Sequence, residues 1–138
     1  MYHVSLADPF CPDLSSRALA AATRAGESFA SDRTYVCVEG PRFSTRAESR
    51  FFRTFADVIG MTLVPEVTLA RERGRCYVCL AMVTDFDVWA DRPVDAKEIV
   101  ETMHANVARM RRLLTEYLPS LAIAPNCECA EALERAGV

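Results

Sequence analysis

The sequence predicts an α/β fold, with a mostly parallel or mixed sheet and flanking helices. Short apolar runs alternate along the chain with segments whose apolar residues recur at helical spacing, and the connections between them are short. Alternation of this kind favours right-handed crossovers and parallel strands. The 138 residues, of which 51% are hydrophobic and 25% charged, are enough for one domain with its own core.

Residues 3–44 are predicted to contain two strands with a helix between them. Residues 3–6 form a first short strand, which the two prolines within residues 8–12 end. A helix follows, because apolar residues recur in it at helical spacing: Leu14, Ala18, Ala21 and Ala22. Residues 35–38 form a second strand, and residues 39–44 form a loop rich in turn residues.

The clearest helix start lies at Thr45. Thr45 and Glu48 match a capping box, in which each side chain bonds the backbone of the other residue. The apolar face of this helix consists of phenylalanines: Phe51, Phe52 and Phe55. We therefore assign Glu48, Arg42 and Arg46 to the structure of this region rather than to catalysis.

Residues 57–61 form the next predicted strand. Pro65 and Glu66 then predict a helix start, and Gly74 is the expected left-handed stop of that helix. Residues 76–83 are a continuous apolar run, which predicts a buried strand.

The last third of the chain is predicted to be helical. A long helix begins at Asp95, with Glu98 three residues later. Its apolar residues recur every three or four positions: Ile99, Met103, Val107, Met110 and Leu114. Residues 129–136 predict a weak terminal helix.

The most informative feature is a pair of carboxylates that follows the strand at residues 76–83. Asp85 and Asp87 fall on the same side of an extended chain, at the sheet edge where α/β proteins bind ligands. Like charges this close resist joint ionisation, so one carboxyl is expected to keep a proton near neutral pH. The alternative is that Asp85 caps a turn and Asp87 is solvated. The two interpretations stay open on the residues alone.

Three loops at strand ends carry the candidate chemistry. They contain Phe43 and Ser44, Met61 and Thr62, and the segment 85–87. In an open parallel sheet such loops lie along one edge and face a common crevice.

Charge and hydropathy exclude two classes of partner. The formal charge of -3 and the scattered arginines predict no nucleic acid partner. Met1 is followed at once by residues 2–6 without an apolar leader, and the longest apolar run is too short to cross a bilayer. We expect a cytoplasmic protein with no membrane partner.

Six cysteines without a secretion signal indicate buried thiols first, and disulfides or metal second. They are Cys11, Cys37, Cys76, Cys79, Cys127 and Cys129. Cys76 and Cys79 would face opposite sides of a strand, so we interpret them as core packing. Cys127 and Cys129 leave two readings, a redox or stapling pair and a chance spacing. No paired Cys/His spacing of the zinc type is present, so the sequence predicts no metal.

Four ordered stretches resemble the trimeric purine nucleoside phosphorylases, and within them the methylthioadenosine phosphorylases. They are HVSLADPFCP at 3–12, EGPRFSTRAES at 39–49, DVIGMT at 57–62 and AMVTDFD at 81–87 with Trp89. The resemblance fades after Leu114. Because family members are about twice this long, residues 1–138 are expected to be a single partial domain, the C-terminal half of the phosphorylase fold. The half that carries the family's Gly-rich phosphate loop would be missing.

The resemblance implies a pentosyltransferase. The reaction would be phosphorolysis of S-methyl-5'-thioadenosine to adenine and 5-methylthioribose 1-phosphate, in purine and methionine salvage. Inorganic phosphate would be the co-substrate, no cofactor is expected, and the full-length protein would be a homo-oligomer, a trimer or a dimer of trimers. The alternatives are a general purine nucleoside phosphorylase acting on adenosine or inosine, and a non-catalytic truncated purine-binding fragment.

The resemblance assigns the catalytic role to Asp85, which would donate a hydrogen bond to purine N7 of the leaving base. Asp87 would accept from the 6-amino group, since a carboxylate attracts an amino group and repels a carbonyl oxygen. Phe43 would flank the base, with Ser44 as a polar neighbour. For Phe43 the alternative is ordinary core packing.

The remaining assignments concern the sugar, the phosphate and the 5' group. By resemblance, Met61 would lie against the ribose and Thr62 would bind phosphate at a helix start. Ile99 and Val100 would line the 5'-methylthio pocket, and His3 would reach a neighbouring subunit's site. Thr62 could equally be a plain helix cap, and a lone histidine near a terminus is often structural or solvated.

Overall fold

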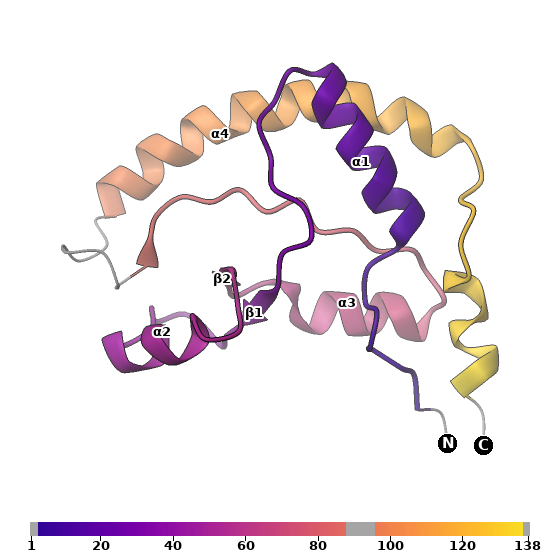
Figure 1. The fold of residues 1–138 in the computed structure, drawn as a ribbon, viewed down its shortest axis with the longest axis horizontal. Coiled ribbons are helices and arrows are strands. Elements are labelled where there is room, and N and C mark those ends of the chain that lie inside the picture. Colours follow the sequence, from indigo (N-terminus) through magenta and orange to yellow (C-terminus); the bar gives the residue numbers. More distant parts are fainter. Residues whose placement is uncertain (1–2, 88–95, 137–138) are drawn as a thin grey trace. The chain divides into compact units, whose positions relative to one another are not determined.

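The structure is a computed structural model that describes residues 3–87 and 96–136 (Figure 1). The chain divides into two compact units. Unit 1 combines Met1–Phe29, Thr62–Leu80 and Arg112–Val138, and unit 2 combines Ala30–Met61 and Ala81–Arg111. Each unit is therefore built from segments that are distant in the sequence.

In unit 1 the predicted first helix is confirmed as α1, Pro12–Arg24. Cys11 is its N-cap residue, and the Cys11 Sγ accepts a hydrogen bond from the Leu14 backbone N–H at 3.4 Å. Pro12 occupies the first helical position, where its missing N–H costs nothing. The buried face consists of alanines: Ala18, Ala21 and Ala22.

The second helix of unit 1 is α3, Leu63–Glu72. Val64 keeps an extended backbone inside this span (φ -104°, ψ 130°), because the residue before a proline is disfavoured in the helical region. Gly74 has a φ of +59°, which confirms the predicted left-handed stop. Leu63 and Val67 are the buried residues of α3.

The core of unit 1 joins α1 to the end of α4, the long helix Ala96–Tyr117. Tyr117 is 4% exposed, packs with Ala18 and Ala21, and donates a hydrogen bond to the Leu14 carbonyl at 3.3 Å. Half-buried apolar residues from α4 and from the segment that follows α3 complete this cluster: Leu113, Leu114, Val78 and Leu80. The core therefore depends on three separate parts of the chain.

The C-terminal segment of unit 1 folds into short 3-10 turns. They are η2 Leu118–Ala122, η3 Cys129–Ala132 and η4 Glu134–Ala136. The predicted terminal helix at 129–136 is therefore two single turns rather than an α-helix. The His3 backbone N–H donates to the Ala136 carbonyl at 3.1 Å, which holds the two ends of the described chain side by side (Figure 1).

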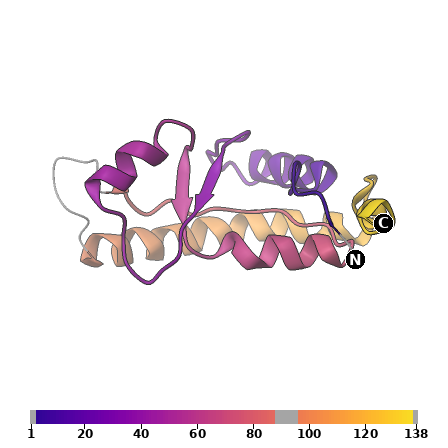
Figure 2. The ribbon, with the colours of Figure 1, turned by 90° about the horizontal axis from the view of Figure 1, so that it is seen from below.

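Unit 2 contains a two-stranded parallel sheet, which Figure 2 shows with its strands side by side. β1 Tyr35–Cys37 pairs with β2 Val58–Gly60, with Tyr35 opposite Val58 and Cys37 opposite Gly60. Two predicted strands and their parallel direction are thereby confirmed. The Asp57 carboxylate accepts from the Thr34 backbone N–H at 2.9 Å and supports the start of the pairing.

The connection between these strands is α2, Arg46–Phe52, and its predicted capping box is confirmed. The Glu48 backbone N–H donates to the Thr45 hydroxyl at 3.2 Å, and the Thr45 N–H donates to the Glu48 carboxylate at 2.7 Å. The predicted phenylalanine face is formed, because Phe51 and Phe55 contact each other edge to face with ring centroids 5.6 Å apart. Both residues are nevertheless exposed.

Two predicted strands are wrong in this structure. Residues 3–6 and residues 76–83 form no strand, because a ladder needs a hydrogen-bonding neighbour and, in the described ranges, only β1 and β2 pair. An isolated backbone hydrogen bond is formed there instead of a ladder: the Tyr77 carbonyl accepts from the Cys11 N–H at 2.8 Å. The predicted helix start at Asp95, like Trp89, lies outside the described residues. None of the helices in the described part of the chain is both long and apolar enough to cross a bilayer.

Candidate functional site

The carboxylate pair lies in a turn of unit 2. The Asp85 carboxylate accepts from the Thr84 hydroxyl and from the Asp87 backbone N–H, each at 2.8 Å. Asp87 has a φ of +54°, a left-handed conformation that Asp tolerates better than most residues. The backbone is therefore not extended at this point, so the expectation that Asp85 and Asp87 lie on the same side of an extended chain does not hold. The turn-capping alternative describes Asp85 in this structure, and both acids are half-buried.

A side chain of α4 holds the segment that leads into this turn. The Asn106 side-chain amide donates to the Val83 carbonyl at 2.8 Å, within unit 2. Ile99 and Val100 lie two turns earlier on the same helix. Ile99 is half-buried and Val100 is 55% exposed, so this end of α4 presents apolar side chains that unit 2 does not cover.

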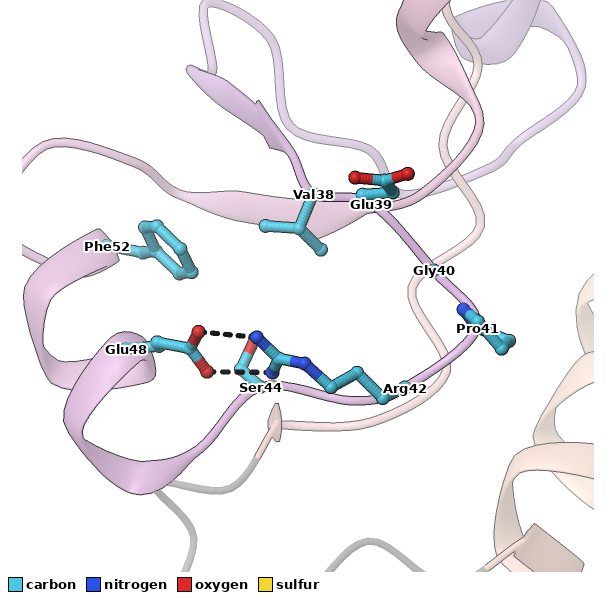
Figure 3. A pocket seen from close by; sticks show the side chains of 8 residues that line it. All are labelled: Val38, Glu39, Gly40, Pro41, Arg42, Ser44, Glu48 and Phe52. Carbon is cyan, nitrogen blue, oxygen red and sulfur yellow. Dashed lines mark hydrogen bonds and ion pairs between the residues drawn. The ribbon is translucent and has the colours of Figure 1, made fainter.

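A pocket of about 620 Å³ opens at the loop between β1 and α2 (Figure 3). It is lined by Val38, Glu39, Gly40, Pro41, Arg42, Ser44, Glu48 and Phe52. Of the predicted site residues, Ser44 is the one that lines it. Phe43 is 55% exposed and is not part of the lining.

An ion pair crosses the pocket wall. Two Arg42 nitrogens donate to the Glu48 carboxylate at 2.7 and 2.9 Å, as Figure 3 shows. The Arg42 bonds, followed by those from Thr45, lower the pKa of Glu48 to about 2. The structural assignment of Arg42 and Glu48 is confirmed, because the charge of Arg42 is already neutralised within the protein. The pocket then offers the Glu39 carboxylate and the Ser44 hydroxyl, which suit a hydrogen-bond donor better than an anion.

Met61 lies against the same loop. A Cβ placed on Gly40 would be 2.9 Å from the Met61 Sδ, so the thioether packs directly over the Gly40 backbone. The structure thus brings Met61 together with the loop that carries Phe43 and Ser44, all within unit 2.

Thr62 and His3 belong to unit 1. Thr62 is the N-cap residue of α3, yet its side chain makes no capping hydrogen bond. The cap position is therefore as predicted, while the hydroxyl is not used as a cap. His3 is exposed, and its backbone is held by Ala136.

Unit 1 contains a cluster of thiols that was not predicted from the sequence. The Sγ atoms of Cys11, Cys76, Cys127 and Cys129 all lie within 4.8 Å of one another. No local spacing predicts this cluster, since its members come from three segments that are far apart in the sequence. The signal that was available is compositional: six cysteines in 138 residues.

Residues 1–119 match the sequence profile of the Phosphorylase superfamily. The chain belongs to this superfamily. The match includes all of unit 2, unit 1 up to residue 119, and every segment with predicted site residues, which agrees with the resemblance noted from the sequence.

Within this superfamily, the chain is similar to curated S-methyl-5'-thioadenosine phosphorylases. The chain is 53% identical over 135 residues to the S-methyl-5'-thioadenosine phosphorylase of Thermofilum pendens, covering 97% of this chain and 52% of the relative. It is 54% identical over 132 residues to that of Pyrococcus horikoshii, covering 96% and 51%. The chain therefore spans about half the length of the curated relatives it matches.

Solved structures give the same result for the fold. A methylthioadenosine phosphorylase from an antarctic soil metagenomic library superposes with a TM-score of 0.91 at 38% identity, covering 99% of this chain and 50% of that one. The methylthioadenosine phosphorylase of Schistosoma mansoni in complex with adenine gives 0.82 at 30% identity, covering 98% and 54%. The predicted α/β phosphorylase fold is confirmed.

Proposed function

We propose that this chain forms part of a phosphorylase that cleaves S-methyl-5'-thioadenosine with inorganic phosphate, releasing adenine and 5-methylthioribose 1-phosphate. The observation that carries the proposal is the 53% identity to the Thermofilum pendens S-methyl-5'-thioadenosine phosphorylase over 97% of this chain. The reaction needs no cofactor. The enzyme would work in the cytoplasm as a homo-oligomer, a trimer or a dimer of trimers.

The proposed catalytic group is Asp85. Phosphorolysis requires a hydrogen-bond donor for the electron-rich purine that leaves, and a protonated carboxyl aimed at N7 supplies it. The bond from the Asp87 N–H to one Asp85 oxygen supports this role, because it orients the carboxyl group. The second oxygen accepts from the Thr84 hydroxyl, which can rotate when the base arrives.

The neighbouring residues would select adenine. Asp87, in its left-handed turn, would accept from the 6-amino group. The exposed ring of Phe43 would stack on the base, and the Ser44 hydroxyl would bond its edge.

The sugar and phosphate would be bound by residues at the start of α3 and on α4. Met61, packed on Gly40, would contact the ribose, and the Thr62 hydroxyl would bind phosphate because it is not used as a cap. Ile99 and the exposed Val100 would contact the methylthio group. His3, exposed in unit 1, would complete the site of a neighbouring subunit.

The test is a full-length protein in which this chain replaces the matching half of the Thermofilum pendens relative. We expect adenine release that depends on phosphate. Asp85→Asn should lower kcat by about 10²- to 10⁴-fold, the range for loss of an acid–base group. Asp8→Asn, at an exposed turn of unit 1, is the matched control and should leave kcat unchanged. Full activity of the Asp85→Asn protein would exclude the role given to Asp85.

A second candidate function is purine binding without turnover by the 138-residue chain alone. Large apolar side chains of unit 2 are exposed, Phe86 at 70%, which favours a chain whose site is covered only in a larger assembly. Calorimetric titration with adenine, beside an assay for adenine release, separates the two functions. Turnover by the isolated chain would eliminate the second candidate.

A further inference from the structure

We propose that Cys11, Cys76, Cys127 and Cys129 bind a single zinc ion in unit 1. The site is independent of the proposed phosphorolysis, because none of its four residues contributes to the nucleoside or phosphate contacts. All four Sγ atoms lie within 4.8 Å of one another.

The distances fit a tetrahedral ion better than a disulfide. Four thiolates at about 2.3 Å from zinc lie about 3.8 Å from each other, whereas bonded sulfurs lie about 2.05 Å apart. The Sγ atoms of Cys76 and Cys127 are separated by 3.4 Å. Changes of up to about 1 Å in the separations, made by rotating side-chain torsions, would bring the four sulfurs to the spacing that zinc requires.

Backbone contacts hold the contributing segments together. The Cys11 N–H donates to the Tyr77 carbonyl at 2.8 Å, which sets Cys11 beside the segment that carries Cys76. A Cβ on Gly74 would be 3.0 Å from the Ala130 carbonyl oxygen, so the same segment also lies against η3, which begins at Cys129. The arrangement of the sulfurs thus follows from the fold of unit 1.

A backbone hydrogen bond supports one of the proposed ligands. The Leu14 N–H, in the first turn of α1, donates to the Cys11 Sγ at 3.4 Å. Backbone N–H groups that donate to ligand sulfurs are the supporting contacts that metal–thiolate sites use.

Burial differs among the four members of the cluster. Cys11 and Cys129 are buried, whereas Cys76 and Cys127 are half-buried. A divalent cation would replace the thiol protons and bind the thiolates directly.

The ligand set selects the metal and its role. Four thiolates in a tetrahedral arrangement suit zinc, whereas hard cations such as Mg²⁺ and Ca²⁺ prefer oxygen ligands. Four protein ligands leave no open position for water or substrate, so the ion would be structural. It would attach residues 127–129 to the N-terminus of α1, where Cys11 is the N-cap residue.

The first experiment uses the whole chain, purified with reductant. Metal analysis should find a single zinc per chain. Titration of the metal-free protein with Co²⁺ should produce the sulfur-to-cobalt charge-transfer band and the intense visible bands of a tetrahedral thiolate site. Absence of these bands, or a chain whose four thiols are paired as disulfides despite the reductant, would overturn the proposal.

The second experiment identifies the ligands without altering the fold. Alkylation rates of all six cysteines are followed by mass spectrometry with and without zinc. Zinc should slow the alkylation of Cys11, Cys76, Cys127 and Cys129, and leave Cys37 and Cys79 unchanged. Equal protection of all six, or of none, would contradict the site.

Variants complete the test. Cys129→Ser and Cys127→Ser should each lose the bound zinc and its Co²⁺ spectrum. The matched controls are Cys79→Ser and Cys37→Ser, which remove half-buried thiols outside the cluster and should retain both. Zinc that remains bound at full stoichiometry in the first two variants would place the ion elsewhere.

Discussion

Unit 1 and unit 2 differ in how much they bury. Within the described residues, the buried hydrophobic side chains all belong to unit 1, and the buried residue of unit 2 is Ser49. Unit 1 also contains the contacts between distant segments, such as Arg17 with the carbonyls of Ser120 and Ile123 at 2.7 and 2.8 Å. Unit 2 instead contains most of the candidate site and exposed phenylalanines.

This difference separates the well-buried unit from the unit that contains most of the candidate site. Regions with few buried apolar contacts open at low free energy, and binding segments are drawn from such regions. The candidate residues Phe43, Asp85 and Asp87 therefore depend on local turns and caps, whereas the cysteine cluster depends on tertiary packing. Four predictions test or refine this contrast.

The largest effect is expected from the core of unit 1. Tyr117→Ala should lower the free energy of unfolding by about 3–5 kcal/mol, since it empties a site that the surrounding residues cannot refill. Urea denaturation measures the change. Phe55→Ala is the matched control in unit 2: its ring is 52% exposed, so its loss should cost far less. Equal costs would remove the contrast between the units.

The next effect tests the sheet of unit 2. A Cβ on Gly60 would overlap the Tyr35 hydroxyl across the β1–β2 pair. Gly60→Ala should therefore destabilise the chain by about 1–3 kcal/mol, the usual cost of overpacking. In a Tyr35→Val background, whose shorter side chain does not reach Gly60, the same substitution should cost much less. An unchanged cost in that background would show that the Tyr35 ring is not the obstacle.

A smaller change in the free energy of unfolding is expected from the N-cap residues of α2 and α3. Thr45→Ala removes a hydroxyl that accepts the Glu48 N–H, and should cost about 1 kcal/mol. Thr62→Ala changes the same residue type at an N-cap position without a capping bond, and should leave stability nearly unchanged while it weakens phosphate binding in the full-length protein. Denaturation curves measure the stability of both variants, and phosphate titrations measure phosphate binding by the full-length protein. The reverse order of stabilities would contradict the capping geometry.

The smallest expected effect is a pH dependence of the stability of α2. The pKa of Glu48 is lowered to about 2 by Arg42 first and by Thr45 next. A lowered carboxyl pKa means that the stabilising contribution is complete above the ordinary Glu pKa and is lost as the pH falls through about 2. Amide hydrogen exchange of α2, followed as the pH is lowered, should show faster opening. Glu48→Gln should remove this part of the dependence, and an unaltered profile would contradict it.

The elements that local chemistry specifies were predicted well. The capping box at Thr45, the glycine stop of α3 and the β1–α2–β2 order all depend on local signals in the sequence. A cap or a stop forms from neighbouring backbone groups, so the sequence carries the whole signal. For the candidate site, the loop that the sequence singled out contains Ser44, which lines the pocket, while the role of Asp85 stays a prediction.

The tertiary structure alone decided the remaining features. Residues 76–83 are apolar enough for a strand, but a ladder needs a neighbouring strand, and the described residues provide none. The turn at Asp87 depends on a backbone conformation that spacing does not encode. The cysteine cluster joins residues up to 118 positions apart, from Cys11 to Cys129. Local bonds can be read along a chain, whereas contacts between distant segments exist only once packing has brought those segments together.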